Sequence, residues 1–361
     1  MFLLKNMLAH CRDPRQEVRD ASITNVFRSL SVYGSTLEPA AWDACCWEVV
    51  FPLLDDLSDM IRHHNEVDNE DASEEQTVPQ PNGPPLRLVD KQWDDSKSLA
   101  LRSTGDVFFE YLAILVKTDR YENTWDGFLQ RLQDSFIVDR AGPATASMQA
   151  LEQVLSVALD TSNADRISSS WERAWRAWDA IGADIEHNEQ DVENVHAKAY
   201  TQVNLETFVR VALSIYTPPY LVFDLPRVQR MLAVVRAALL YSHSPDYRVD
   251  IDGLMPLHAT VLEVVAAIKL DELPGAAAAV ITELSDYVTL AFTASFDAPS
   301  YGSIGKAGQR VTYIALTKEV MPHIQWLFDK YRDDPSVYED GALERVLEVR
   351  ALSDFLASVA R

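Results

Sequence analysis

The residues with the most obvious capacity for chemistry are two adjacent histidines, His63 and His64. Carboxylates lie near them in the sequence, at Asp55, Asp56, Asp59 and Glu66. Imidazole and carboxylate groups together are typical ligands of Zn²⁺. Neighbouring side chains on a helix, however, point about 100° apart, so both imidazoles cannot easily reach one ion. The pair therefore indicates a solvated helix end, and we expect no metal site.

A glycine-rich stretch from Gly302 to Gly308 precedes an expected helix and contains Lys306. Backbone amides and a lysine at a helix N-terminus can bind an anion. A P-loop, however, follows a strand and ends in GK[ST], and this stretch does neither. We interpret it as a flexible turn, with an anion or lipid-headgroup site as the alternative.

The motifs of common hydrolases and nucleotide enzymes are absent from the sequence, since no HExxH, GxSxG or P-loop pattern occurs. The carboxylates between residues 186 and 193 are more typical of a solvated helix face than of a catalytic pair. Glycine makes up 12 of 361 residues, about 3% against a usual value of about 7%. We therefore predict no catalytic residues, no cofactor and no enzymatic activity.

The chain is strongly acidic, because its 32 Lys and Arg residues are outnumbered by 55 Asp and Glu residues, for a net charge of −23. Nucleic acids and anionic lipids repel such a chain, so we expect no nucleic-acid partner and only indirect membrane contact. The cysteines Cys11, Cys45 and Cys46 have neither disulfide-framework nor zinc spacing, which is typical of core thiols in a reducing compartment. No apolar run is long enough to span a bilayer. These features favour a cytoplasmic protein.

Hydrophobic periodicity predicts an all-α fold. A first helix should start at Asp13, a good N-cap, followed by Pro14, and should end at Gly34. Its apolar face comprises Val18, Ala21, Ile23, Val26, Phe27 and Leu30. A second helix should start near Glu38, with a kink or break at Pro52. Its apolar residues are Trp42, Cys45, Cys46, Val49, Val50, Leu53, Leu54 and Leu57.

Between residues 65 and 92 the composition becomes acidic and proline-rich, which predicts a disordered insert. The alternative is an acidic tether for a basic partner segment.

Ser168 to Ser170 should cap a later helix. Further helices are predicted over 93–116, 121–136, 143–159, 204–216, 226–241, 255–270, 274–292, 304–331 and 338–359.

Asp13, Pro14, Arg15, Val18 and Arg19 have the spacing of a HEAT-repeat signature. In such a repeat an Asp-Pro turn separates two helices, the valine enters the core between them, and the arginine stacks on the Asp turn of a neighbouring repeat. We therefore predict a HEAT/armadillo-like helical-repeat solenoid. Residues 1–155 form its regular part, with the insert at 65–92, and residues 156–361 continue it as an irregular array or form a second, bundle-like helical domain. Because no polar capping repeat precedes it, we expect the chain to be the C-terminal part of a longer protein.

Two groups of residues are candidates for a partner surface. Trp171, Trp175 and Trp178 lie on one helical stripe, which indicates either buried helix packing or a partly exposed aromatic anchor. Arg227 and Arg230, at helical spacing, form either a small basic patch for acidic partners or structural salt bridges.

Three stretches carry a more specific resemblance: residues 13–55, the segment from Asp90 to Ser96, and the segment from Gly105 to Phe108. Over about residues 1–155 the chain resembles the helical region downstream of the exchange domain in large Arf guanine-nucleotide exchange factors. It resembles most closely the C-terminal region of the related MON-two family of Golgi scaffolds, named for monensin sensitivity.

The resemblance implies a large helical scaffold without an exchange domain, peripheral on trans-Golgi and endosomal membranes. It also implies work with Dopey-family proteins and a phospholipid flippase in endosome-to-Golgi recycling. Our first hypothesis is therefore a non-catalytic interaction scaffold, which a groove lined by exposed aromatic residues would support. The alternatives are a regulatory module acting on an Arf-family GTPase, which needs a hydrophobic groove and an acidic finger, and a lipid-binding surface.

Overall fold

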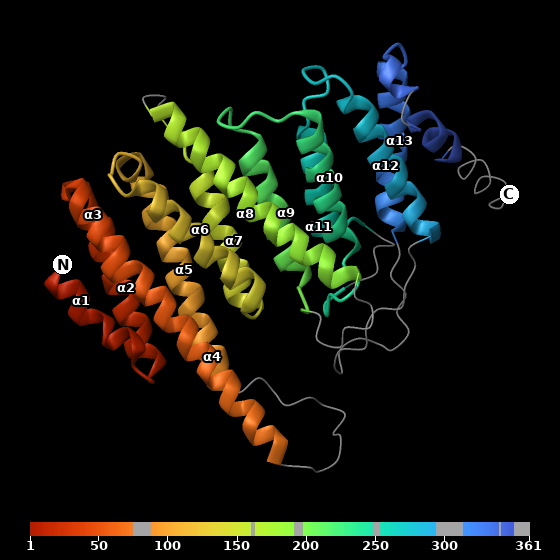
Figure 1. Cartoon of the computed structure of the whole chain (residues 1–361). Helices are drawn as coiled ribbons and strands as arrows, with labels where there is room; N and C mark the ends of the chain where they lie inside the picture. The colour runs from red at the N-terminus through yellow and green to blue at the C-terminus, as the bar shows by residue number, and fades with distance from the viewer. Residues whose placement is uncertain are drawn as a thin grey trace. The chain divides into compact units, whose positions relative to one another are not determined.

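The computed structural model describes residues 1–74, 88–159, 163–190, 198–247, 253–293, 313–338 and 341–349. Within these ranges the secondary structure is helical and contains no strand, which confirms the predicted all-α class (Figure 1). The chain divides into two compact units. Unit 1 comprises Met1–Asp184 and Arg210–Leu221, and unit 2 comprises Ile185–Val209 and Val222–Arg361. This division does not coincide with the one predicted at residue 155.

Unit 1 is built around one long central helix, α5, which packs against α2, α4 and α7. Its elements are α1 (Phe2–Leu8), α2 (Gln16–Tyr33), α3 (Pro39–Cys45), α4 (Phe51–Glu74), α5 (Leu88–Leu115), α6 (Tyr121–Val138) and α7 (Ala141–Leu155), with most of α8 (Ala164–Gln190) and the end of α9 (Gln202–Tyr216). Helices near one another in sequence thus pack together, as in a helical solenoid. The HEAT type of the repeat stays a prediction.

Unit 2 contains the start of α9 and the helices α10 (Leu225–Leu240), α11 (Pro256–Ala267), α12 (Ala276–Thr293) and α13 (Ile314–Tyr331). Residues 342–349 form a further helical segment. Helix α12 packs along α13 and also against α10. The helices predicted over 204–216, 226–241 and 274–292 are confirmed to within a few residues. The glycine-rich stretch from Gly302 to Gly308 lies outside the described residues.

Pro52 does not end the second predicted helix. Helices α3 and α4 are joined by a five-residue π-helical segment, Cys46–Val50, so that the backbone is helical from Pro39 to Glu74. In a regular α-turn Pro52 would have no N–H for the carbonyl of Glu48, and its ring would crowd that carbonyl. The wider π turn just before the proline accommodates both effects.

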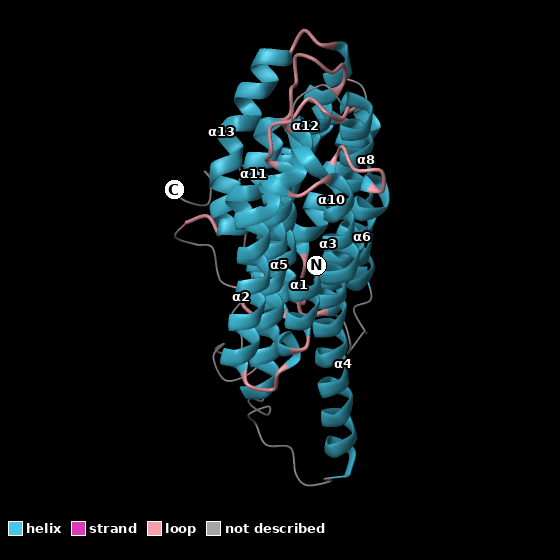
Figure 2. Ribbon diagram, turned by 90° about the vertical axis from the view of Figure 1, so that its left-hand side faces the viewer, coloured by secondary structure: helices cyan, strands magenta, loops and turns pink. Residues whose placement is uncertain are grey.

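The predicted insert at 65–92 is narrower than expected, because α4 continues to Glu74 and α5 already begins at Leu88. Residues 75–87 lie outside the described residues. Glutamate is a good helix former, so an acidic composition alone does not end a helix. In Figure 2 the C-terminal end of α4 projects beyond its neighbours in unit 1.

The core of unit 1 contains most of the predicted apolar faces. All eight apolar residues predicted for the second helix are buried, from Trp42 to Leu57. On α2 the residues from Ile23 to Leu30 that were predicted to face inward are also buried, but Val18 is only half-buried and Ala21 is exposed. The inward position one turn before Ile23 is instead occupied by Arg19.

Gly34 follows α2 at a close approach between backbone and aromatic rings. Its φ of −59° is not left-handed, so conformational freedom is not the reason for a glycine here. A Cβ atom at this position would lie 2.6 Å from the Tyr111 ring and 2.7 Å from the Trp42 ring. Trp42 Nε1 donates to the Gly34 carbonyl at 3.1 Å, and Tyr111 Oη donates to the Ser31 carbonyl at 2.5 Å. The missing side chain lets both rings cover the end of α2.

We expect Gly34→Ala to lower the free energy of unfolding by about 1–3 kcal/mol, because the methyl group overlaps two rings that are themselves hydrogen-bonded. Urea unfolding followed by tryptophan fluorescence measures the change. Gly253→Ala is the control, since a Cβ at Gly253 meets no atom within 4 Å. Equal midpoints for the two variants would contradict the close-approach explanation.

The three cysteines are buried free thiols, as the sequence predicted for core residues. Burial, with a smaller effect of the nearby Asp56 carboxylate, raises the pKa of Cys11 to about 11. Burial likewise raises the pKa of Cys45 and of Cys46. Since the thiolate is the reactive form, neither access nor ionisation favours reaction in the folded chain.

We therefore expect iodoacetamide at pH 8 to leave all three thiols of the native chain unmodified and to alkylate all three after denaturation in urea. Intact-mass spectrometry counts the added groups. Rapid modification of the native chain would show that this part of unit 1 opens, or that these thiols are activated.

Candidate functional site

Arg19 of the predicted repeat signature is fully buried in unit 1, and its donors point at main-chain and side-chain acceptors from two segments. Its Nη1 donates to the carbonyl of Asp13 at 2.8 Å. Its Nε donates to Ser96 Oγ at 2.8 Å, and its Nη2 donates to the carbonyl of Gln92 at 3.0 Å. The guanidinium thus joins the turn before α2 to the first turns of α5.

Aromatic and acidic groups complete the surroundings of Arg19. Its Cζ lies 3.8 Å from the centroid of the Trp93 ring, which is a cation–π geometry. Ser96 in turn donates to the carboxylate of Asp20. Burial lowers the pKa of the Arg19 guanidinium, and the charges of Asp20 and Asp13 oppose that effect. Burying a charge is costly unless hydrogen bonds and nearby opposite charge compensate it. Here the guanidinium donates to three acceptors, and Ser96 links it to the carboxylate of Asp20.

The turn before α2 differs from the predicted cap. Helix α2 begins at Gln16, and the Asp13 carboxylate accepts from the Arg15 backbone N–H at 2.9 Å and from Arg15 Nε at 2.9 Å. Asp13 therefore forms an Asx-type turn rather than an N-cap, with Pro14 inside that turn. These hydrogen bonds from Arg15 lower the pKa of Asp13 to about 2. Nor does Arg19 stack on the turn of a neighbouring repeat, since it bonds its own turn and α5.

A buried ion pair lies further along α5. Lys97 pairs with Asp139, both side chains are almost completely buried, and Lys97 Nζ donates to Ser58 Oγ at 2.7 Å. These contacts connect α5 to α4 and to the turn between α6 and α7. Nothing in the local sequence pattern distinguishes Lys97 from an exposed lysine, because its partners come from distant segments.

The tryptophan stripe of α8 is not a surface. Trp171, Trp175 and Trp178 are buried, so the aromatic-anchor alternative is wrong and the packing alternative is confirmed. Trp171 contacts the Tyr220 ring with centroids 4.7 Å apart. Ser168 to Ser170 lie inside α8 rather than at its start, and Ser170 Oγ donates to the Arg166 carbonyl.

Arg227 and Arg230, the predicted basic patch, form hydrogen bonds and an ion pair within unit 2. Arg230 Nη1 lies 2.8 and 3.0 Å from the two carboxylate oxygens of Glu186. Arg227 Nη1 donates to the carbonyl of Val222 at 2.8 Å, and its backbone N–H donates to Asp224 at the start of α10. The salt-bridge alternative therefore holds for Arg230, and Arg227 has a local structural role.

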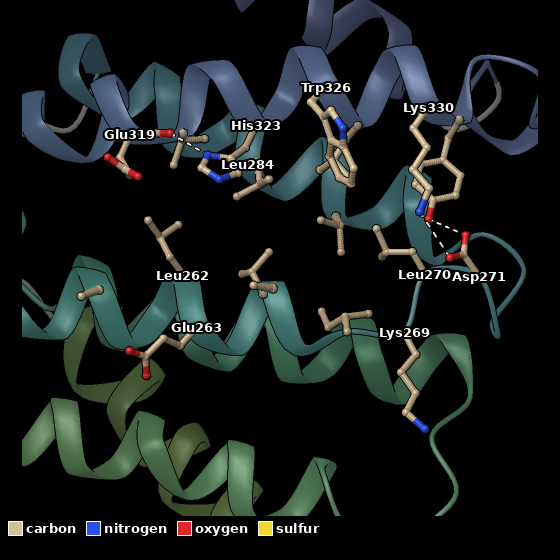
Figure 3. Close-up of a pocket in the computed structure, with 18 of the residues that line it drawn as sticks. Leu262, Glu263, Lys269, Leu270, Asp271, Leu284, Glu319, His323, Trp326 and Lys330 are labelled. Carbon is tan, nitrogen blue, oxygen red and sulfur yellow. Dashed lines mark hydrogen bonds and ion pairs between the residues drawn. The ribbon is translucent and has the colours of Figure 1, made fainter.

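Unit 2 contains a surface groove that we did not predict from the sequence. It lies between α11 and α13, has a cavity volume of about 680 Å³, and has α12 as its floor (Figure 3). The floor and walls are mainly aliphatic, with Leu262 from α11, Val280 and Leu284 from α12, and Leu327 from α13. Trp326 stands on the rim and is 59% exposed. All eight tryptophans fall in the described part of the chain, and Trp326 is the exposed one.

Charged residues occupy both ends of this groove (Figure 3). Glu263 of α11 and Glu319 of α13 line one end. At the other end Asp271 lies 3.3 Å from Lys330 Nζ and accepts from Tyr331 Oη at 2.6 Å. These two hydrogen bonds, first from Tyr331 and then from Lys330, lower the pKa of Asp271.

One sequence pattern on α13 does indicate a surface at the groove. Glu319, His323, Trp326 and Lys330 follow one another at steps of 4, 3 and 4, so they share one face of α13. A single tryptophan among polar residues on one helical face is unusual for a core position. The stripe of three tryptophans on α8 is the stronger pattern, and it is a core stripe.

Other candidate sites gain no support. Among the described residues, no group of three His, Cys, Asp or Glu side chains is placed to hold a metal ion. His63 is exposed, and the side chain of His64 lies outside the described part. No helix in the described ranges is both long and apolar enough to cross a membrane.

Arg19 offers a test of the buried cluster. We expect Arg19→Ala to lower the free energy of unfolding by about 3 kcal/mol or more, because it leaves several buried acceptors unpaired. Arg19→Lys should restore little, since an ammonium cannot reproduce the spaced donors of a guanidinium. Urea unfolding measures both variants. The exposed Arg15→Ala should stay within about 0.5 kcal/mol of the wild type. Full stability of Arg19→Lys would contradict this role.

Known proteins with similar sequences identify the family. A family model described as the C-terminal region of Mon2 protein matches residues 1–182. The "Protein MON2 homolog" of Drosophila melanogaster is 26% identical over 184 residues, which cover 48% of this chain and 10% of the relative. The human protein of the same name is 20% identical over 161 residues, which cover 43% and 9%. The "Monensin-resistant homolog 2" of Caenorhabditis elegans is 20% identical over 203 residues, which cover 49% and 12%.

The matched region thus spans about a tenth of the length of these relatives. No solved structure matches the chain. The family match covers the first segment of unit 1, Met1–Asp184, almost completely, including Arg19 and the residues that bind it. The chain belongs to the Mon2 family, as a member of the group defined by the C-terminal region of Mon2 protein.

Proposed function

We propose that this chain is a non-catalytic interaction region of a Mon2-family trafficking scaffold, and that it docks protein partners in the groove between α11 and α13. The observation that carries the proposal is the exposed Trp326 on the rim of an open, mainly aliphatic groove. Tryptophan is among the residues most often found as energetic hot spots at protein interfaces. An exposed aromatic beside an apolar depression therefore favours a partner surface.

The lining of the groove supports binding rather than catalysis. Among its described lining residues there is no serine, threonine or cysteine that could serve as a nucleophile. His323 Nδ1 makes a 2.8 Å hydrogen bond with the backbone carbonyl of Glu319, one turn earlier on its own helix. Asp271 is held by Tyr331 and Lys330. His323 and Asp271 are thus engaged in hydrogen bonds within the protein and do not converge on a reacting atom.

The cellular setting of the proposal comes from the family. Mon2-family membership favours a scaffold in endosome-to-Golgi recycling, peripheral on trans-Golgi and endosomal membranes. We propose a Dopey-family protein as the direct partner, with a phospholipid flippase in the same assembly. The net charge of −23 favours membrane association through such partners rather than through anionic lipid.

A second candidate is regulation of an Arf-family GTPase, because the groove meets one of its two requirements, a hydrophobic groove. Acceleration of nucleotide release by the purified chain would favour this candidate. An unchanged release rate would leave the docking proposal as the better explanation of the groove.

Size-exclusion chromatography with light scattering tests the main proposal. We expect the purified chain and a Dopey-family protein to co-elute as a stoichiometric complex. Trp326→Ala should weaken the complex at least tenfold, as truncation of a tryptophan hot spot does. Tyr33→Ala is the control, because Tyr33 is a similarly exposed aromatic residue, at 63%, but lies in unit 1.

Two separate peaks for the wild-type chain would contradict direct docking of this partner. A complex that forms equally well with Trp326→Ala would place the docking surface outside the groove.

A further inference from the structure

The geometry points to an amphipathic α-helix as the occupant of the groove, with aliphatic side chains on its buried face and Lys or Arg residues at the end next to Glu263 and Glu319. This inference rests on the proposed docking function and adds the chemistry of the partner.

The shape of the groove fits a short helix. Glu319 and Lys330 mark its two ends on α13, about 16 Å apart along the helix axis at 1.5 Å per residue. That length corresponds to three turns. A helix of three turns presents apolar side chains at positions i, i+3, i+4 and i+7, which is the usual pattern of helix-in-groove recognition. The aliphatic floor formed by Val280 and Leu284 would receive these side chains.

The charges of the groove indicate which end of a bound helix should carry cationic residues. In Figure 3 Glu263 and Glu319 lie on opposite sides of the groove at the same end. Within the described part of the chain, neither carboxylate has a cationic partner. At the opposite end Asp271 is already paired with Lys330, and Glu272 lies 3.2 Å from Lys269. The end with two uncompensated carboxylates therefore attracts cationic residues, whereas the other end is close to neutral.

The same charges argue against other occupants. An acyl chain would use the aliphatic floor, but its carboxylate or phosphate head would be repelled at the Glu263 end. A second copy of this chain would bring another surface of a protein with net charge −23. A helix with a basic end satisfies both the apolar floor and the acidic end.

A designed peptide tests this inference with the full chain. The probe is a 14-residue fluorescein-labelled helix, constrained by a lactam staple, with leucines on one face and two lysines in its first turn. The matched peptide carries two glutamates at those positions. Fluorescence anisotropy gives both dissociation constants. We expect the lysine peptide to bind at least tenfold more tightly than the glutamate peptide, and Trp326→Ala to weaken binding at least tenfold.

Charge exchange in the groove gives the decisive control. In the double variant Glu263→Lys and Glu319→Lys, the preference should reverse in favour of the glutamate peptide. The double variant Glu17→Lys and Glu38→Lys changes the net charge equally at exposed positions in unit 1 and should keep the original preference. Both double variants need the circular dichroism spectrum of the wild type.

Failure of this inference can be separated from failure of the docking function. If the Dopey-family complex depends on Trp326 but neither peptide binds, docking stands and the helical occupant is wrong. Trp326-dependent binding of phosphatidylcholine–phosphatidylserine vesicles without peptide binding would assign the groove to lipid and overturn the inference. Trp326-dependent self-association in light scattering would assign it to a second copy and overturn it as well.

Discussion

The structure of unit 1 depends on the burial of one positive charge. The Arg19 guanidinium is fully buried, and its donors need acceptors because a buried charge without hydrogen bonds is very costly. The acceptors come from the Asp13 turn and from residues 92–96 of α5. Satisfying this one group therefore fixes the start of α2 against the start of α5. Two of the three stretches that indicated the family contain these segments, so the residues that bind Arg19 have a structural role there.

Aromatic side chains have two different roles in this chain. Trp42 and Tyr111 of unit 1 are buried, and Gly34 has no side chain where these two rings cover the end of α2. In unit 2 Trp326 stands at the edge of an aliphatic groove that no described segment fills. An interior ring is explained by packing alone, whereas a large exposed ring beside an apolar depression calls for a partner. The contrast places the proposed interaction outside the region that the family match covers.

Charge then shapes what such a partner can be. A chain with net charge −23 gains selectivity for basic segments from its surface as a whole, but that attraction is long-ranged and unspecific. Two carboxylates at one end of an apolar groove add a local attraction for cationic residues, which favours one orientation of the bound segment. Charge placement of this kind contributes more to specificity and orientation than to affinity, which the aliphatic floor and Trp326 would supply.

The sequence by itself determined the helical class, the core faces of the second helix and the burial of the cysteines, because these follow from local periodicity and composition. It also determined the family, through stretches such as Asp13 to Arg19 and Asp90 to Ser96. Only the tertiary structure decided that Arg19 is an interior residue, that the α8 tryptophans are core, and that Trp326 is exposed. Each of these depends on which distant segment covers a side chain. Arg19 is separated from Ser96 by more than seventy residues, and no pattern local to either one reveals the contact. The groove likewise exists only because α12 lies beneath both α11 and α13, an arrangement that periodicity along one helix cannot express.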